Sequence, residues 1–213
     1  RGLGDVYKRQ ILAPCGAMES LTAAVNAGAD AVYLGEEYFS ARKNADNFTA
    51  EQLCDAVRFC HYSGVKVYVT LNTLVFDREI PLLAKAIENC AKADVDAFIV
   101  QDMGVARLAR QIVPELPLHA STQMTVNSPE GAIMSKELGF TRVVLGRELS
   151  LAQIKAITES CEIETELFVH GALCVCISGQ CYMSSVLGGR SGNRGLCAQP
   201  CRLDFTSGDR HNV

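Results

Sequence analysis

Residues 64–101 have the sequence GVKVYVTLNTLVFDREIPLLAKAIENCAKADVDAFIVQ, which places one helical segment between two β-type segments. The apolar runs at 65–72 and 97–101 lack strict alternation, as is typical of strands covered on both faces. Between them, residues 78–93 carry alanine, leucine and isoleucine at helical spacing. A strand, a helix and a second strand joined in this way predict a parallel βαβ unit.

This pattern repeats along the whole chain. Strands are predicted at 11–14, 31–35, 65–72, 97–101, 118–121, 142–146 and 164–170, and helices at 18–27, 49–63, 78–93, 104–113, 128–138 and 150–160. Thr49 with Gln52, and Ser150 with Gln153, have capping-box spacing, which supports two of the helix starts. We predict an α/β fold, a (β/α) TIM-type barrel truncated at its C-terminus, with a cysteine-rich loop after the seventh strand. A doubly wound sheet is the alternative, although the first turn, 14–17, has one glycine where a dinucleotide-binding fingerprint has three.

Composition narrows the class of protein. The 213 residues are 48% hydrophobic and 21% charged with a net charge of −4, which excludes a disordered chain and a generally basic nucleic-acid coat. No stretch is long and apolar enough to span a membrane, and the first residues lack the apolar core of a secretory signal, so we expect a cytoplasmic protein. We expect residues 1–10 to be a non-native leader, 11–205 to be one barrel domain from a longer protein, and 206–213 to be a polar tail at the truncation point.

Polar residues follow several of the predicted strands. In a (β/α) barrel the active site lies at the C-terminal ends of the strands. Solvated loop residues are the alternative explanation for about half of these positions, because any strand end meets water. The candidates are Glu36, Asn72, Gln101, Asp102, Gln123, Arg147, Glu148 and His170.

The ten cysteines fall into two groups. Five are scattered over the strands and helices and are expected to pack as small apolar side chains. Disulfides are disfavoured in a chain without a secretion signal, which leaves structural zinc or an iron–sulfur cluster for the second group. Spacing alone does not separate these two. The second group is Cys174, Cys176, Cys181, Cys197 and Cys201.

The segment around these cysteines has an unusual charge. Residues 167–203 contain no Asp or Glu, but they include Arg190, Arg194 and Arg202. A cluster held by four thiolates is negatively charged, so an acid-free, arginine-bearing loop suits it. The same arginines could instead hold RNA phosphates, and a solvated basic loop is the plainest alternative.

In this segment the sequence resembles the collagenase-like peptidase family U-32. The stretches GADAVYLG at 28–35, RVVLGRELS at 142–150 and NRGLCAQPCR at 193–202 are also similar to this family, so the resemblance covers about residues 11–205. The family signature has ten defined positions at fixed spacing, and all of them match here. They are Glu166, Phe168, Gly171, Ala172, Leu173, Cys174, Gly179, Cys181, Met183 and Ser184.

The resemblance implies a function and a cofactor. Relatives in this family are oxygen-independent hydroxylases with a 4Fe–4S cluster. Some modify a base in tRNA or rRNA with prephenate as the oxygen source, and others act on the ubiquinone ring. This chain's motifs look more like those of the RNA-modifying branches. The resemblance implies Cys174, Cys181 and Cys197 as cluster ligands, with Cys201 or a cysteine further downstream as the fourth. Cys176 is not a signature position, and in an extended chain it would point away from Cys174.

We therefore predict a 4Fe–4S-dependent hydroxylase that modifies tRNA or rRNA and uses a small carboxylate such as prephenate. His170 and Glu148 are the predicted catalytic residues, and a structural histidine at the edge of the core is the alternative for His170. Arg147 and Arg194 are predicted to bind carboxylate or phosphate groups, and Glu36, Asn72 and Gln123 to bind substrate. For Arg147, an ion pair with Glu148 is the alternative.

Two other functions remain open. A collagenase-like protease would need a nucleophile such as Cys174 or Cys181 with His170, because the sequence has neither a His-Glu-x-x-His helix nor a Gly-x-Ser-x-Gly elbow. A zinc-stabilised, non-enzymatic RNA-binding scaffold would use the same cysteines for structure alone.

Overall fold

The computed structural model describes residues 9–41, 43, 46–207 and 210–211, which form two compact units. Among the described residues, unit 1 ends at His119 and unit 2 begins at Ala120. Residues 1–8 of the predicted leader lie outside the described residues. The single barrel domain over 11–205 stays a prediction.

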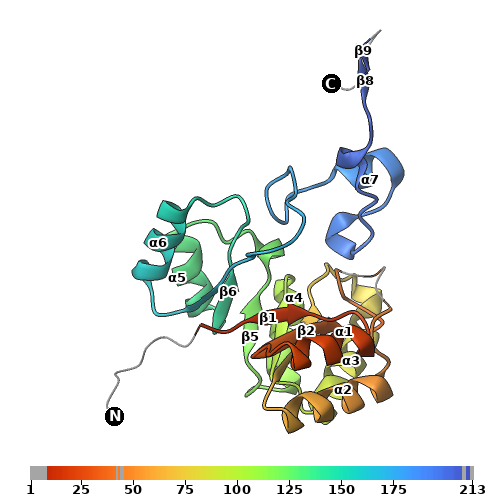
Figure 1. Ribbon diagram of the computed structural model, residues 1–213, viewed down its shortest axis with the longest axis vertical. Helices are drawn as coiled ribbons and strands as arrows, with labels where there is room; N and C mark the ends of the chain where they lie inside the picture. Colours follow the sequence, from red (N-terminus) through yellow and green to blue (C-terminus); the bar gives the residue numbers. More distant parts are fainter. Residues whose placement is uncertain (1–8, 42, 44–45, 208–209, 212–213) are drawn as a thin grey trace. The chain divides into compact units, whose positions relative to one another are not determined.

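Unit 1 alternates strands with helices (Figure 1). Its strands β1, β2, β3 and β4 pair in parallel and in chain order, each with the next. The elements are β1 (Leu12–Pro14), α1 (Met18–Asn26), β2 (Ala31–Gly35), α2 (Ala50–Tyr62), β3 (Lys66–Leu71), η1 (Asp77–Glu79), α3 (Ile80–Lys92), β4 (Ala97–Val100), α4 (Met103–Ile112) and β5 (Leu118–Ala120), which ends at the boundary with unit 2.

Two layers of apolar side chains hold unit 1 together. On one face of the sheet, Ala31, Tyr68, Ala97 and Ile99 form a buried cluster. The register explains this cluster, because Tyr68 lies opposite Ala97, and Ala31 lies opposite Lys66, two residues before Tyr68 and therefore on the same face. The intervening strand residues point to the other face, towards the helices, and are as completely buried. Strands covered on both faces account for the continuous apolar runs in the sequence.

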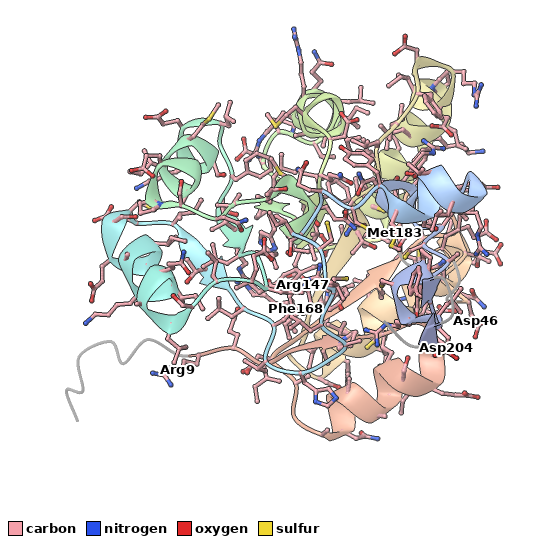
Figure 2. All side chains as sticks on the ribbon, turned by 90° about the horizontal axis from the view of Figure 1, so that it is seen from above. Arg9, Asp46, Arg147, Phe168, Met183 and Asp204 are labelled. Carbon is pink, nitrogen blue, oxygen red and sulfur yellow. The ribbon has the colours of Figure 1, made fainter. Side chains whose placement is uncertain are left out.

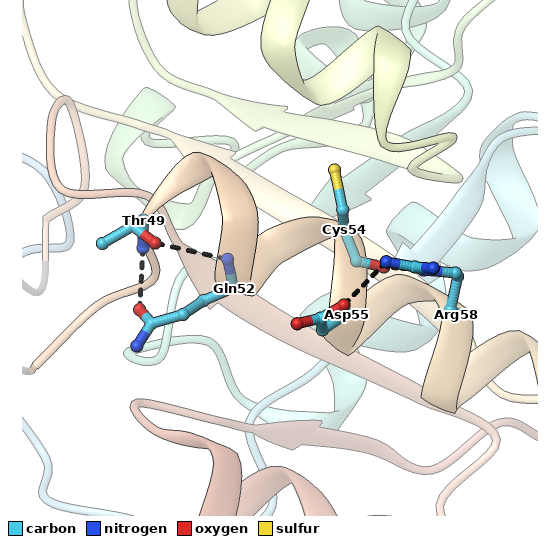
Figure 3. A network of polar contacts seen from close by, with 5 residues as sticks. All are labelled: Thr49, Gln52, Cys54, Asp55 and Arg58. Atoms are coloured by element: carbon cyan, nitrogen blue, oxygen red, sulfur yellow. Dashed lines mark hydrogen bonds and ion pairs between the residues drawn. The ribbon is translucent and has the colours of Figure 1, made fainter.

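The capping box predicted for α2 is present (Figure 3). Thr49 Oγ1 accepts a hydrogen bond from the Gln52 amide at 3.2 Å, and Gln52 Oε1 accepts one from the Thr49 amide at 3.0 Å. Ser150 and Gln153 make the same reciprocal pair at the start of α6. These contacts satisfy amide groups that the first helical turn leaves without partners.

Unit 2 begins with the same alternation and then becomes irregular. The strands β6 and β7 pair in parallel over three residues each. Its elements are η2 (Thr122–Met124), α5 (Pro129–Glu137), β6 (Arg142–Val144), α6 (Leu151–Ser160), β7 (Glu164–Glu166), α7 (Met183–Gly188), η3 (Gly192–Arg194), η4 (Pro200–Arg202), β8 (Thr206–Ser207) and β9 (Arg210–His211).

Two predicted strands extend at their C-terminal ends by two residues or more beyond the observed strands. The prediction of a strand at 164–170 is wrong beyond Glu166, and that at 142–146 is wrong beyond Val144. The reason is a loss of pairing partners. The Gly146 amide donates to Val126 O, so β6 leaves the ladder and residues after Glu166 have no strand to pair with. Within the predicted polar tail, β8 and β9 form an antiparallel pair.

The strand order decides between the two predicted fold classes. In a doubly wound sheet the order reverses at a switch point. In unit 1 the order follows the chain from β1 to β4 without reversal. The (β/α) TIM-type barrel class is therefore confirmed. Within the described residues, no helix is both long and apolar enough to cross a membrane.

Candidate metal centre

The five clustered cysteines lie in the irregular part of unit 2. Residues 167–182 form neither helix nor strand. Of the five thiols, only that of Cys181 is half-buried, and the other four are exposed. None of them forms a disulfide. All five are therefore chemically available to a metal or a cluster.

Cys176 lies close to two of the predicted ligands. The thiols of Cys181 and Cys174 are near enough to act on it electrostatically. Desolvation, followed by the neighbouring Cys181 and Cys174 thiols, raises the pKa of Cys176. The chain bends at residues 175–176, so the alternation of an extended chain does not apply there. The exclusion of Cys176 from the ligand set stays a prediction.

The other predicted ligands are also brought near one another. A Cβ built on Gly192 would lie 3.7 Å from the Cys197 Cβ and 3.9 Å from the Cys181 carbonyl oxygen. Arg202, the neighbour of Cys201, donates a hydrogen bond to the Leu173 carbonyl at 3.2 Å. The second contact brings the chain around Cys201 to the chain around Cys174.

The turn after β5 holds one side of the cysteine loop. Thr125 Oγ1 donates a hydrogen bond to Ser178 O at 2.8 Å and accepts one from Gln180 Nε2 at 2.9 Å. Gly179 packs directly on the backbone of Gln123, whose carbonyl oxygen a Cβ at position 179 would overlap. The loop is thus fixed between Cys176 and Cys181.

The residues after β6 hold the other side of the loop. Arg147 donates to Ser178 Oγ from both its Nε (3.2 Å) and its backbone amide (3.3 Å). Glu148 Oε2 accepts from Ser178 Oγ at 2.9 Å, and its Oε1 accepts from the Ser178 amide at 3.2 Å and from Asn127 Nδ2 at 2.8 Å. Ser178 is completely buried. We call the five anchoring residues the loop clamp: Gln123, Thr125, Asn127, Arg147 and Glu148.

Arg147 also reaches one of the predicted ligands. Its Nη1 donates a hydrogen bond to Cys174 Sγ at 3.0 Å, and Figure 2 labels this residue in the side-chain view. Within the described residues, the ion pairs do not include one between Arg147 and Glu148. Both side chains share Ser178 instead. The two charged side chains are therefore joined through the Ser178 hydroxyl and not by a direct contact.

Glycine is required where the clamp is tightest. A Cβ at Gly146 would overlap Asn127 Oδ1 and approach Glu148 Oε1 to 2.9 Å. A Cβ at this position would therefore force the Asn127 side chain, which donates to Glu148, to move.

Replacing Gly179 with alanine is expected to release the cysteine loop. Gly179 has a φ of +78°, and an added Cβ would also overlap the Gln123 carbonyl. Backbone strain and the overlap together should cost about 3 kcal/mol of loop docking. The measurement is protease cleavage within residues 174–201, which should accelerate. Gly189→Ala is the control, because Gly189 has a φ of +65° with nothing within 4 Å, and it should cost about 1 kcal/mol. Equal cleavage rates for the two variants would contradict this account.

The carboxylate of Glu148 gives the clamp a pH dependence. Partial desolvation opposes its charge, but hydrogen bonds from its own amide, from Ser178 and from Asn127 outweigh this and lower its pKa below the ordinary 4.5. A lowered pKa stabilises the folded clamp above pH 4.5, and that contribution is lost as the pH falls through the folded-state value. The Ser178 amide should therefore lose protection from hydrogen exchange as the pH falls through the folded-state pKa of Glu148.

A Glu148→Gln variant provides the matched control for the pH prediction. Its side chain does not titrate, so the protection of the Ser178 amide should no longer depend on acid in this range. The Ala132 amide, which donates within α5 to Ser128 O, reports on the unit as a whole. Equal acid sensitivity at Ser178 in both proteins would assign the effect to another group.

Two predicted substrate-binding residues belong to unit 1 and have partners within it. Glu36 is 5% exposed and accepts a hydrogen bond from Asn89 of α3. Burial raises its pKa above the ordinary value, although the Asn89 hydrogen bond acts in the opposite direction. Asn72 Oδ1 accepts a hydrogen bond from the Ala41 amide at 2.9 Å. Their roles in substrate binding stay predictions.

The other predicted site residues lie in unit 2. His170 is exposed in the irregular segment after β7, and Arg194 is half-buried in η3. Gln123 anchors the loop through its backbone. The roles assigned to these residues in catalysis or binding also stay predictions.

Sequence reasoning missed Ser178, Asn127 and Thr125. Ser178 adjoins Gly179, a signature position, so a turn there was foreseeable. Asn127 precedes the N-cap Ser128 and resembles an ordinary helix start. No local pattern indicates that Ser178 or Asn127 contacts the residues after β6.

The donor set suits a thiolate-bound metal group. Cysteine sulfur is the ligand of iron–sulfur clusters and of many structural zinc sites. Acidic side chains are absent from residues 167–203, so no carboxylate of this segment competes for the metal. Within the described residues, however, no three potential ligands are already grouped around one point. The cysteine thiols are the ligand type that the cofactor requires. They would have to move closer together to bind it.

Comparison with known proteins identifies one sequence family, whose members carry different functional names. The chain matches the sequence profile of peptidase family U32 over residues 16–212. It is 43% identical over 203 residues to the 23S rRNA 5-hydroxycytidine C2501 synthase of Escherichia coli, covering 95% of this chain and 30% of that protein. It is 38% identical to tRNA hydroxylation protein P1 of Bacillus subtilis, covering 93% and 47%. It is also 38% identical to a collagenase of Porphyromonas gingivalis, covering 97% and 52%.

The solved structures support the fold. The U32 peptidase Mk0906 superposes with a TM-score of 0.65 at 18% identity, covering 78% of this chain and 71% of that one. The chain spans only about a third to a half of the length of the three curated relatives.

Proposed function

Because this chain belongs to peptidase family U32, we propose that it is part of an oxygen-independent hydroxylase that modifies a base in tRNA or rRNA. The proposed cofactor is a 4Fe–4S cluster, the proposed oxygen donor is a small carboxylate such as prephenate, and the proposed compartment is the cytoplasm. Relatives named for rRNA and tRNA hydroxylation, at 43% and 38% identity, support the choice of reaction and substrate.

One structural observation carries the proposal. The loop between Cys176 and Cys181 is anchored through the buried Ser178 to residues that follow β5 and β6. The ends of strands are where (β/α) barrels place their active sites. A loop that merely covered the surface would not need a completely buried serine with hydrogen bonds from two separate segments.

Different residues of this chain would bind the cluster and take part in catalysis. Cys174, Cys181, Cys197 and Cys201 would supply four thiolates, and the bound cluster would supply electron transfer or activation of the oxygen donor. His170 is exposed and able to exchange a proton with substrate. Glu148 is proposed as the second catalytic group, in addition to its role in the clamp.

Arginines would hold the anionic partners. Arg190 and Arg202 are exposed and Arg194 is half-buried. Guanidinium groups bind phosphates and carboxylates through paired hydrogen bonds. Because residues 167–203 carry no acidic side chain, an RNA backbone or a carboxylate donor would meet no like charge from this segment.

The deciding experiment combines metal analysis with an RNA assay. The protein is purified anaerobically, and its iron, sulfide and zinc contents are measured. About four irons and four sulfides per chain, with loss of one hydroxylated nucleotide from cellular RNA when the gene is deleted, would support the proposal. Zinc without iron, or iron-free hydrolysis of gelatin, would overturn it in favour of a scaffold or a peptidase.

A further inference from the structure

Arg147 donates three hydrogen bonds to residues of the cysteine loop. Its Nη1 lies 3.0 Å from Cys174 Sγ, while its Nε and backbone amide lie 3.2 and 3.3 Å from Ser178 Oγ. A guanidinium group is planar and rigid, so fixing Nε also fixes the direction of Nη1. The buried Ser178 thus determines where Arg147 presents a donor to Cys174.

Arg147 directs a charged hydrogen-bond donor at the sulfur of Cys174. Its hydrogen-bond acceptors are a hydroxyl and a thiol. The carboxylate of Glu148 shares the Ser178 hydroxyl with Arg147 and offsets part of its charge, but it accepts its own hydrogen bonds from Ser178 and Asn127. In the described part of the chain, the ion pairs do not involve Arg147. The Nη1 donor of Arg147 is therefore available to Cys174.

We propose that Arg147 is a positioning residue of the metal centre, which orients the Cys174 thiolate and raises the reduction potential of the cluster bound there. The inference rests on the proposed function, because it requires a cluster. Hydrogen bonds to ligand sulfur and positive charge both favour the reduced, more negative form of an iron–sulfur cluster. A residue that only supported the loop would affect how much cluster assembles but not its potential.

The test is an anaerobic redox titration of the iron–sulfur signal by electron paramagnetic resonance, with iron content measured on the same samples. In Arg147→Gln the ratio of reduced to oxidised cluster at a fixed potential should fall about tenfold, which is about 59 mV for one electron. Arg147→Lys retains the charge but not the rigid fork, so it should shift the potential less in the same direction. If Arg147→Gln assembles no cluster, the lysine variant provides the measurement.

Two further variants keep the outcomes distinct. Lys155→Gln removes an exposed charge from α6 of the same unit and should leave the potential unchanged. Ser178→Ala removes the hydroxyl that orients Arg147 and should shift the potential in the same direction as Arg147→Gln. Wild-type potential in every Arg147 variant that assembles a cluster, or an equal shift in Lys155→Gln, would overturn the inference alone. Wild-type protein without iron would overturn both the inference and the proposed cofactor.

Discussion

Replacing Cys174 or Cys181 with alanine is expected to remove nearly all of the iron from anaerobically purified protein. A cubane cluster needs about four thiolates, and each substitution leaves one iron without its ligand. Residues 167–203 contain no Asp or Glu that could replace the lost thiolate as an iron ligand. The measurement is iron and sulfide per chain together with the visible absorption of the cluster, and Cys197→Ala should behave in the same way.

Two other cysteines serve as controls for this result. Cys161 lies at the end of α6 and is half-buried, so Cys161→Ala should retain about four irons. Cys176 is the more informative control, because its thiol contacts that of Cys181. Cys176→Ala should also retain the cluster if the ligand assignment is correct. Full iron content in both Cys174→Ala and Cys181→Ala would show that the assignment is wrong.

Replacing Arg142 with leucine is expected to destabilise the protein by about 3 kcal/mol at neutral pH. Arg142 is 9% exposed, and its guanidinium lies 2.6 Å from Glu164 Oε2 and 3.5 Å from Glu166 Oε2. Burial raises the pKa of Glu166, and Arg142 opposes this effect. Without Arg142, Glu166 would be a largely buried carboxylate without a positive partner. Urea denaturation would measure the loss.

The Arg142 prediction has a definite pH dependence and a matched control. In the variant, the folded-state pKa of Glu166 rises further, so the destabilisation should be fully present above that pKa and should diminish as the pH falls and Glu166 is protonated. Adding Glu166→Gln should recover much of the lost stability. The Glu164 side chain is 66% exposed, and Glu164→Gln should cost less than about 1 kcal/mol. Equal losses for Glu164→Gln and Arg142→Leu would contradict the assignment of the effect to Glu166.

Much of the fold could be predicted because its determinants are local. The alternation of apolar runs with helical patterns depends on neighbouring residues, and so do the capping boxes at Thr49 and Ser150. The strand ends could not be predicted in the same way. Residues 167–170 are apolar enough for a strand, but a strand also needs a partner, and β6 leaves the sheet at Val144. Pairing is a property of two distant segments.

The candidate site shows the same division. Its cysteines and Gly179 are recognisable from their spacing alone. The clamp is not, because Thr125 and Ser178 are 53 positions apart and Glu148 and Ser178 are 30 apart. The positions of Arg147 and Glu148 after a predicted strand indicate that they belong to the site. No sequence pattern indicates that both of them bind Ser178.

The amino-acid sequence by itself determined the fold class, the family and the five candidate thiols, since these depend on periodicity, turn chemistry and fixed spacing along the chain. Only the tertiary structure decided that Cys176 lies beside Cys181, that β7 ends at Glu166, and that Arg147 donates to Cys174. Each of these depends on a bend, a lost strand partner or a buried hydroxyl. Such features arise from contacts between segments that are remote in sequence, and no local pattern records them.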